Sequence, residues 1–378
     1  MALVLNEEQQ LLKESAEGFF KEKAPVSQLR RLRDDKDELG YSKGLWAEMS
    51  EMGFAGLLVD EDHGGTAFGY VGAGIVAEAM GHTLSPSPFM ASSIVAASVV
   101  AAAGSEAQKA ELLPVIASGE LVVTFAIDEG SRHSPEDVAL KAEKAGDGYK
   151  LSGLKTFVPD GSGADKILVL ARTSGEAGER DGLSLFIVDR GAKGLIIDSI
   201  VSVDSRNWTK VTFEGVSLDG SALIGGEGKA LDTVEPALDR ARIVVAAELL
   251  GISQYCFTET VEYLKERKQF GVPIGSFQAL QHRAAELYGE IEVTRSAVLK
   301  ALQMADAGGD VAWFASLAKA KASKTAELAT NEAIQMHGGI GMTDEFDMGF
   351  YIKRARVLQH LYGDFNYHAD RFAHLSGY

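Results

Sequence analysis

Cysteine is almost absent from this sequence, since Cys256 is the single one among 378 residues. One cysteine cannot form an intrachain disulfide, and it cannot supply the sulfur ligands of a structural zinc site or an iron–sulfur cluster. Histidine and carboxylate sites are not excluded by this argument, but we predict no metal site. A chain with so little cysteine suits a reducing compartment, and we expect a cytoplasmic protein.

Long apolar runs and basic residues are also scarce. No stretch reaches the roughly 18 consecutive apolar residues of a membrane-spanning helix, and the most apolar segment, 91–103, is short and rich in alanine and serine. Lys and Arg number 37 against 54 Asp and Glu, which gives a net charge of −17. A surface of this sign repels nucleic acid and anionic membranes, so we expect neither as a partner.

The spacing and composition of the apolar residues change twice along the sequence, which predicts three domains and an α+β fold. Residues 1–120 show helical spacing, and Asn6 is a plausible N-cap of the first helix. Residues 121–225 consist of short β-branched or aromatic runs separated by Gly, Asp and Ser, which indicates a central antiparallel β domain. Residues 226–378 contain long, largely apolar helical segments, which predict a C-terminal helical bundle.

Two motifs could bind a ligand. In the segment 267–278 a helix ends in charge, a Gly-Pro turn follows, and Ser276 could cap the next helix. This pattern is typical of a plain helix–turn–helix connection. However, Arg267, Phe270 and Gln278 also place a phosphate-binding cation, a stacking ring and an amide around one turn.

The second motif, 335–345, begins with Gln335 and contains Gly338 and Gly339 at a predicted helix end. Glycines here would let the backbone approach a phosphate closely, or they could simply end the helix. The motif follows a helix rather than a strand, so it is not a dinucleotide-binding fingerprint of the Rossmann type.

In this order and texture the motifs resemble the acyl-CoA dehydrogenase family over essentially the whole chain. The matching segments read EQQLLKESAEGFF, WAEMSEMGFAGLLVDEDHGG, LSGLKTFVPDGSGADKILVLART, YLKERKQFGVPIGSFQALQHRAAELY and IQMHGGIGMTDEF. The resemblance implies FAD-dependent α,β-dehydrogenation of an acyl-CoA, with electrons passed to an electron-transfer flavoprotein. It also implies that the C-terminal domain is a four-helix bundle. A homotetramer or a mixed tetramer with a related chain is implied as well.

The resemblance assigns residues to the cofactor in two groups. The adenosine-diphosphate part of an FAD held across a subunit interface would meet Arg267, Phe270, Gln278, Gln335, Gly338 and Gly339. The isoalloxazine would lie near Phe125, Ile127, Phe157 and Pro159. In this chain Ile127 stands where relatives carry a flavin-bonding threonine, and Pro159 offers neither a hydroxyl nor an N–H.

Neither usual position of the catalytic base holds a glutamate. One position is Gly363 and the other is Ala241, directly before Arg242. Among nearby carboxylates, Asp364 and Glu248 are our candidates for the base, and Glu248 is equally well explained as a buried partner of an arginine or histidine.

We assign substrate binding to Asp239, Arg242, Arg132 and Gly363. Asp239 matches an aspartate that contacts the pantetheine arm in relatives, or it pairs with Arg242 one helical turn later. Arg132 could contact a phosphate or a polar acyl group of the substrate, or it could lie in a solvated loop. The small residues Gly363 and Ala241 favour a bulky or branched acyl group.

Three functions fit this sequence. The first is a complete acyl-CoA dehydrogenase, and the second is a base-deficient partner in a mixed tetramer. The third is another flavin oxidation on the same fold, because a fold does not fix a reaction.

Overall fold

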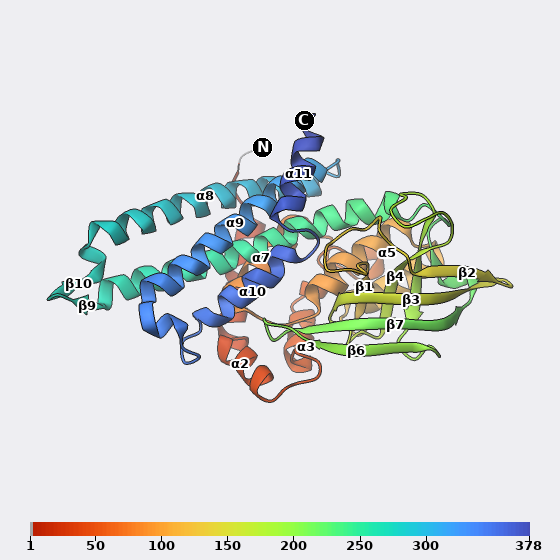
Figure 1. The fold of residues 1–378 in the computed structure, drawn as a ribbon, viewed down its shortest axis with the longest axis horizontal. Coiled ribbons are helices and arrows are strands. Elements are labelled where there is room, and N and C mark those ends of the chain that lie inside the picture. Colours follow the sequence, from red (N-terminus) through yellow and green to blue (C-terminus); the bar gives the residue numbers. More distant parts are fainter. Residues whose placement is uncertain (1–2) are drawn as a thin grey trace. The chain divides into compact units, whose positions relative to one another are not determined.

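The computed structural model describes residues 3–378 (Figure 1). The chain divides into two compact units. Met1 and Ala2, which open the predicted N-terminal domain, lie outside the described residues. The boundary at Ala241 falls inside one continuous helix, α7 (Leu231–Glu266). Unit 1 comprises Met1–Leu29, Tyr70–Ser85 and Arg242–Tyr378, and unit 2 comprises Arg30–Gly69 and Pro86–Ala241.

Unit 1 is helical and contains the C-terminal bundle. Helices α8 and α9 pack along each other, and α9 also contacts α10 and α11 (Figure 1). Two helices from the N-terminal region, α1 and α4, pack together in the same unit. Besides most of α7, the helices are α1 (Glu7–Lys23), α4 (Tyr70–Thr83), α8 (Gln278–Asp306), α9 (Ala312–His337), α10 (Met348–His360) and α11 (Phe365–Leu375).

The predicted N-cap of α1 is confirmed. The Asn6 side chain accepts a hydrogen bond from the Gln9 N–H at 2.8 Å, and the Gln9 side chain accepts one from the Asn6 N–H at 3.0 Å. This reciprocal pair satisfies two of the N–H groups that a helix start leaves without partners.

Close approach of α4 and α7 depends on two glycines. A Cβ at Gly81 would lie 2.2 Å from the Glu248 carbonyl oxygen, and one at Gly251 would lie 2.0 Å from the Glu78 carbonyl oxygen. Only residues without a side chain fit where two helix backbones meet so closely. The contact fixes the stretch of α7 that carries Glu248.

Unit 2 is built on one mostly antiparallel sheet, whose order is β6-β7-β3-β2-β4-β5-β8, with β1 added parallel to β4. Strands β1 and β4 lie in its interior, since all four residues of β1 and six of the seven of β4 are buried. The strands are β1 (Val123–Ala126), β2 (Lys141–Ala145), β3 (Gly148–Pro159), β4 (Lys166–Arg172), β5 (Leu183–Asp189), β6 (Leu195–Val201), β7 (Asn207–Leu218) and β8 (Leu223–Ile224).

Helices complete unit 2. A π-helical segment packs on β1, where the Ser92 hydroxyl accepts a hydrogen bond from the Val123 N–H at 3.1 Å. The predicted α+β architecture, with a helical region, a mostly antiparallel sheet and a helical bundle, is confirmed. The helical elements are α2 (Val26–Asp34, shared with unit 1), α3 (Lys43–Glu51), the π-helix Phe89–Ala96, α5 (Ala97–Ala103), α6 (Glu106–Ala117) and the start of α7.

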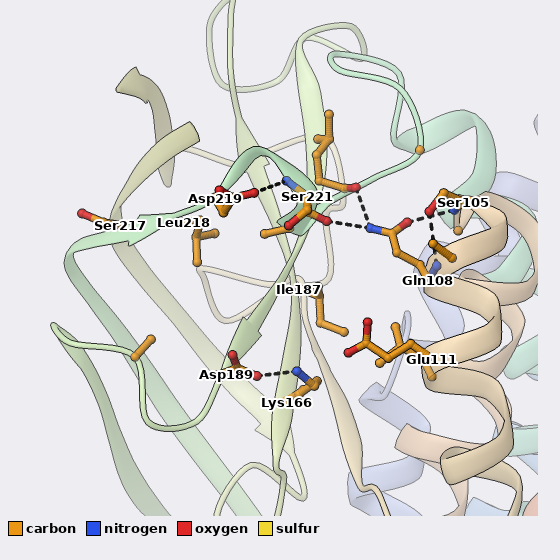
Figure 2. A pocket seen from close by; sticks show the side chains of 18 of the residues that line it. Ser105, Gln108, Glu111, Lys166, Ile187, Asp189, Ser217, Leu218, Asp219 and Ser221 are labelled. Atoms are coloured by element: carbon orange, nitrogen blue, oxygen red, sulfur yellow. Dashed lines mark hydrogen bonds and ion pairs between the residues drawn. The ribbon is translucent and has the colours of Figure 1, made fainter. Parts of the chain in front are cut away.

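A cavity of about 1130 Å³ lies in unit 2 beside the N-terminus of α6 (Figure 2). The Gln108 amide donates to the carbonyls of Ser221 and Leu223 at 2.8 and 2.9 Å, and Lys166 pairs with Asp189 across the floor. These contacts join α6 to the sheet, and no residue that the sequence nominates for a site lines this cavity. Within residues 3–378, no helix has the length and apolarity needed to cross a membrane.

Candidate functional site

The first candidate segment extends from the end of α7 to the start of α8. Arg267 follows α7 directly, a short hairpin of β9 (Lys268–Gln269) and β10 (Val272–Pro273) comes next, and Gln278 opens α8. Phe270 occupies the hairpin turn with a φ of +54°, and its side chain is 93% exposed. Arg267 and Gln278 are exposed too, so a cation, a ring and an amide all face solvent.

The expected cap of α8 is wrong. Helix α8 has Phe277 as its N-cap and no side-chain cap bond. The Ser276 hydroxyl instead donates to the Pro273 carbonyl at 2.7 Å. Ser276 belongs to a 3-10 turn that ends one residue before the capping position, so its hydroxyl stabilises that turn.

The second candidate segment is the end of α9. Gln335 is exposed on the last turn, and Gly338 ends the helix with a φ of +64°. A Cβ added at Gly338 or Gly339 would meet nothing within 4 Å, so the space beside this backbone is open. Glycine at a positive φ gives a ligand close access to backbone N–H groups.

These six exposed residues suit the adenosine-diphosphate part of FAD. Arg267 provides a cation for the diphosphate, Phe270 offers a ring face for adenine, and the glycine pair leaves room for a phosphate or ribose. All of them lie exposed on the surface of unit 1.

The residues nominated for the isoalloxazine lie in unit 2, where β1 and β3 end. Phe157 sits in a bulge of β3 with a φ of +50° and is 51% exposed. The Thr124 hydroxyl donates to the Pro159 carbonyl, which ties β1 to the residues after the bulge. Phe125 and Ile127, in contrast, bury their side chains inside the unit. Of these three residues, Phe157 alone offers an accessible side chain.

A buried ion pair fixes the loop after β1. The Lys155 ammonium is fully buried and donates to the Ile127 carbonyl at 2.7 Å and to the Glu129 carboxylate at 2.8 Å. Burial lowers the pKa of Lys155 to about 8, against the raising effect of the Glu129 charge. His133 is engaged with Asp128 at 3.0 Å.

Arg132 lies exposed in this loop, at the edge of unit 2. Its guanidinium can meet an anionic ligand from solvent, because the neighbouring His133 and Asp128 are occupied with each other. The geometry is compatible with both readings of Arg132, a phosphate contact and a solvated loop residue.

Gly363 occupies a turn that has no space for a side chain. Its φ is +112°, and the preceding Tyr362 has a φ of +57°. A Cβ at Gly363 would lie 2.4 Å from Cδ1 of Tyr367 and 2.8 Å from Nε2 of His368. A side chain at position 363 would therefore collide with two residues of α11. The assignment of Gly363 to substrate binding stays a prediction.

Two fully buried cations hold this turn. The Arg242 guanidinium Nε donates to the Tyr362 carbonyl at 2.9 Å, and the Lys319 ammonium donates to the Gly363 and Gln359 carbonyls at 2.9 and 3.0 Å. Burial, with the nearby Arg242 charge, lowers the pKa of Lys319 to about 7. Positive φ values at successive residues are unfavourable, and these bonds keep the backbone there.

The two candidate bases both have structural contacts. The Asp364 carboxylate caps α11 by accepting a hydrogen bond from the Tyr367 N–H at 2.8 Å. Glu248 forms a buried ion pair with Arg354, whose Nε lies 2.8 Å from Oε1. The pairing of Glu248 matches the structural alternative given above for this residue.

Asp239 lies in the part of α7 that belongs to unit 2, and its side chain is buried. Arg242, one turn later, opens the part in unit 1, and its guanidinium also reaches the Tyr367 hydroxyl at 3.1 Å. Both residues thus lie on the helix that runs through both units.

Sequence reasoning missed Lys319, Arg354 and His368. Lys319 carries one available signal, because its spacing from the buried Ala315, Ala318 and Ala322 places it on the buried face of α9. A charge on such a face requires partners, but the sequence does not say which ones.

Comparison with known proteins identifies the family. Three domain models match, described as the N-terminal domain (residues 6–120), the middle domain (128–216) and the C-terminal domain (228–374) of acyl-CoA dehydrogenase. The long-chain specific acyl-CoA dehydrogenase of Sus scrofa mitochondria is 30% identical over 369 residues, which cover 96% of this chain and 85% of the relative.

Two solved structures share the fold over nearly the full length. Butyryl-CoA dehydrogenase from Megasphaera elsdenii has a TM-score of 0.92 at 26% identity and covers 100% of both chains. A variant of the steroid ACAD Tcur3481-Tcur3483 has a TM-score of 0.88 at 29% identity and covers 98% of both chains. The chain therefore belongs to the acyl-CoA dehydrogenase family, the FAD-dependent oxidoreductases that act on acyl-CoA.

Proposed function

We propose that this chain is the FAD-binding, base-deficient subunit of an acyl-CoA dehydrogenase completed by a related chain that carries the base. The observation that supports this is the turn at Gly363. It has no side chain at the position of the base, and Tyr367 and His368 fill the space that a side chain would enter. The turn is built into unit 1 and is not an open site that has simply lost one carboxylate.

The reaction needs a base because the α-proton of a thioester is only weakly acidic. A carboxylate that removes it must be desolvated and aimed at the substrate. The Asp364 carboxylate caps the N-terminus of α11, and the Glu248 carboxylate is paired with Arg354. These contacts restrict the directions in which either carboxylate can point. These contacts favour a base from another chain over either residue.

The cofactor would be shared between subunits. When bound, FAD supplies the hydride acceptor for the β-carbon. We propose that the exposed cation, ring, amides and glycines of the two unit 1 segments hold its adenosine-diphosphate part from the neighbouring subunit, while Phe157 of unit 2 forms a wall beside the isoalloxazine. Pro159 offers no N–H at the position where relatives have a hydroxyl residue, so fewer donors reach the ring there.

The acyl group is not indicated by the relatives, which are named for long-chain, butyryl and steroid substrates. We propose Arg132, Asp239 and Arg242 as substrate contacts. Arg132 suits an anionic part of CoA in a protein of net charge −17, which otherwise repels anions. For the acyl part we propose a bulky or branched chain, because the small side chain of Ala241 leaves room beside it.

The partners we propose follow from the same features. The six exposed FAD residues favour an oligomer, and the two-component name Tcur3481-Tcur3483 of a similar structure favours a mixed one. An electron-transfer flavoprotein would take the electrons onward. The single thiol, which is buried, favours a cytoplasmic location.

The test compares the visible flavin spectrum before and after anaerobic addition of acyl-CoAs. The chain is purified alone, and it is also purified through an affinity tag from the organism that encodes it, together with any chains bound to it. Long-chain, butyryl and steroid side-chain CoA thioesters are then added to each sample. We expect bleaching by one of them in the mixed assembly and none with the chain alone. Bleaching of the chain alone would overturn the proposal.

Asp364→Asn separates the proposal from a self-sufficient dehydrogenase, because asparagine also caps helices and leaves α11 in place. A base at Asp364 is the second candidate, favoured by its place next to Gly363. We expect the variant to match the parent in the mixed assembly. Loss of bleaching in the variant would assign the base to this chain.

A further inference from the structure

We propose that Tyr263 and His337 are positioning residues that hold the two FAD segments, 267–278 and 335–339, at the separation the cofactor requires. This inference rests on the FAD contacts proposed above. Neither residue needs to touch FAD. The backbone of Tyr263 is hydrogen-bonded to Arg267, which opens the first segment, and its side chain contacts His337, which lies within the second.

The contact joins the ends of two long helices. The Tyr263 and His337 rings lie 4.4 Å apart between centroids, at an interplanar angle of 32°. The Tyr263 hydroxyl also donates to the His337 carbonyl at 3.4 Å. On the other side, the Tyr263 carbonyl accepts the hydrogen bond of the Arg267 N–H at 2.9 Å, the last turn of α7. Tyr263 thus contacts the start of the first segment and the end of α9.

His337 is fixed in one orientation. Its side chain is 3% exposed, and Nδ1 lies 2.7 Å from the Ala333 carbonyl, so Nδ1 carries the proton that is donated. The Phe346 ring packs against it at 4.7 Å. Nε2 has no hydrogen-bond partner within the described residues, and burial lowers the pKa of His337. The imidazole therefore acts here as a neutral ring with one donor.

This arrangement controls the cofactor segments because His337 directly precedes Gly338. The backbone turns at Gly338 with a φ of +64°, and Gln335 lies two residues before His337. A ring that shifts in the contact moves this turn relative to Arg267 and Phe270. A diphosphate and an adenine bound by both segments need that distance to be constant.

The experiment measures FAD affinity by titrating the deflavinated full-length chain, in the assembly it forms, with flavin fluorescence as the readout. His337→Ala and Tyr263→Leu remove the ring contact and should weaken FAD binding about three- to tenfold, the range of one aromatic pair. His337→Phe and Tyr263→Phe keep a ring at each position and should restore most of the affinity.

Two controls separate positioning from general destabilisation. Tyr255→Leu removes another ring pair of unit 1, the stack of Tyr255 on Tyr351 at 4.1 Å, and should lower thermal stability without weakening FAD binding. Arg267→Ala tests the site itself. Unchanged affinity in His337→Ala with weakened binding in Arg267→Ala would overturn the positioning inference alone. Unchanged affinity in both would overturn the proposed site and the inference together.

Discussion

Replacing Gly363 with alanine should destabilise the protein. The new Cβ would lie 2.4 Å from the Tyr367 ring and 2.8 Å from the His368 ring. Overpacking of this kind costs about 1–3 kcal/mol. A side chain at a φ of +112° adds strain of about 1–2 kcal/mol, since L-residues disfavour positive φ. We therefore expect Gly363→Ala to lower the free energy of unfolding by about 2–5 kcal/mol.

Chemical denaturation followed by circular dichroism measures this change, and a double-mutant cycle locates its cause. Tyr367→Ala destabilises the chain by itself, because it removes the hydroxyl and ring that contact Arg242. It also opens the space beside residue 363, so the double variant should lose less stability than the sum of the single ones. Strictly additive losses would show that the clash with Tyr367 is not the cause.

Gly349→Ala is the matched control. Gly349 lies within α10, and a Cβ there meets nothing within 4 Å. Alanine in a helix is more favourable than glycine by about 1 kcal/mol, so this variant should be as stable as the parent or more stable. If Gly363→Ala behaved like Gly349→Ala, α11 would move freely and the reasoning about the filled position would be refuted.

Two further predictions concern buried charges. Glu248→Leu should destabilise the chain by about 3–5 kcal/mol by leaving Arg354 buried without its carboxylate, and adding Arg354→Met should recover most of the loss. Equal thermal unfolding of the single and double variants would contradict this. The pKa of Lys319 is lowered by burial from 10.5 to about 7, so the unfolded chain binds more protons between these values and stability should rise with pH across that window. Lys319→Met should lack this part of the rise, and identical pH slopes in parent and variant would contradict it.

The fold was largely predictable because its periodicities are strong. Long apolar segments with helical spacing predict helices, and short β-branched runs predict strands. The predicted order of a helical region, a sheet and a helical bundle is confirmed. The strand β2 does not follow from this pattern, since its sequence KAEKA carries charges and only one of its residues is buried. Its pairing with β3 is long-range information that a local pattern does not contain.

Candidate site residues could be proposed from the sequence only where they are contiguous. Arg267, Phe270 and Gln278 stand in one motif and lie close in the chain, so local chemistry indicates them. The pairing of Glu248 with Arg354 joins residues 106 positions apart, and it depends on how α7 packs against α10. The packing of the helices decides which cation pairs with Glu248, and a single sequence does not reveal that packing.

The filled position beside Gly363 also has an evolutionary consequence. One codon change that restores a glutamate there would not restore a working base, because its first side-chain atom would collide with Tyr367 and His368. Two residues of α11 would have to change with it, and each step alone would weaken the fold. A side chain at position 363 therefore requires coordinated changes in α11 and not a single substitution.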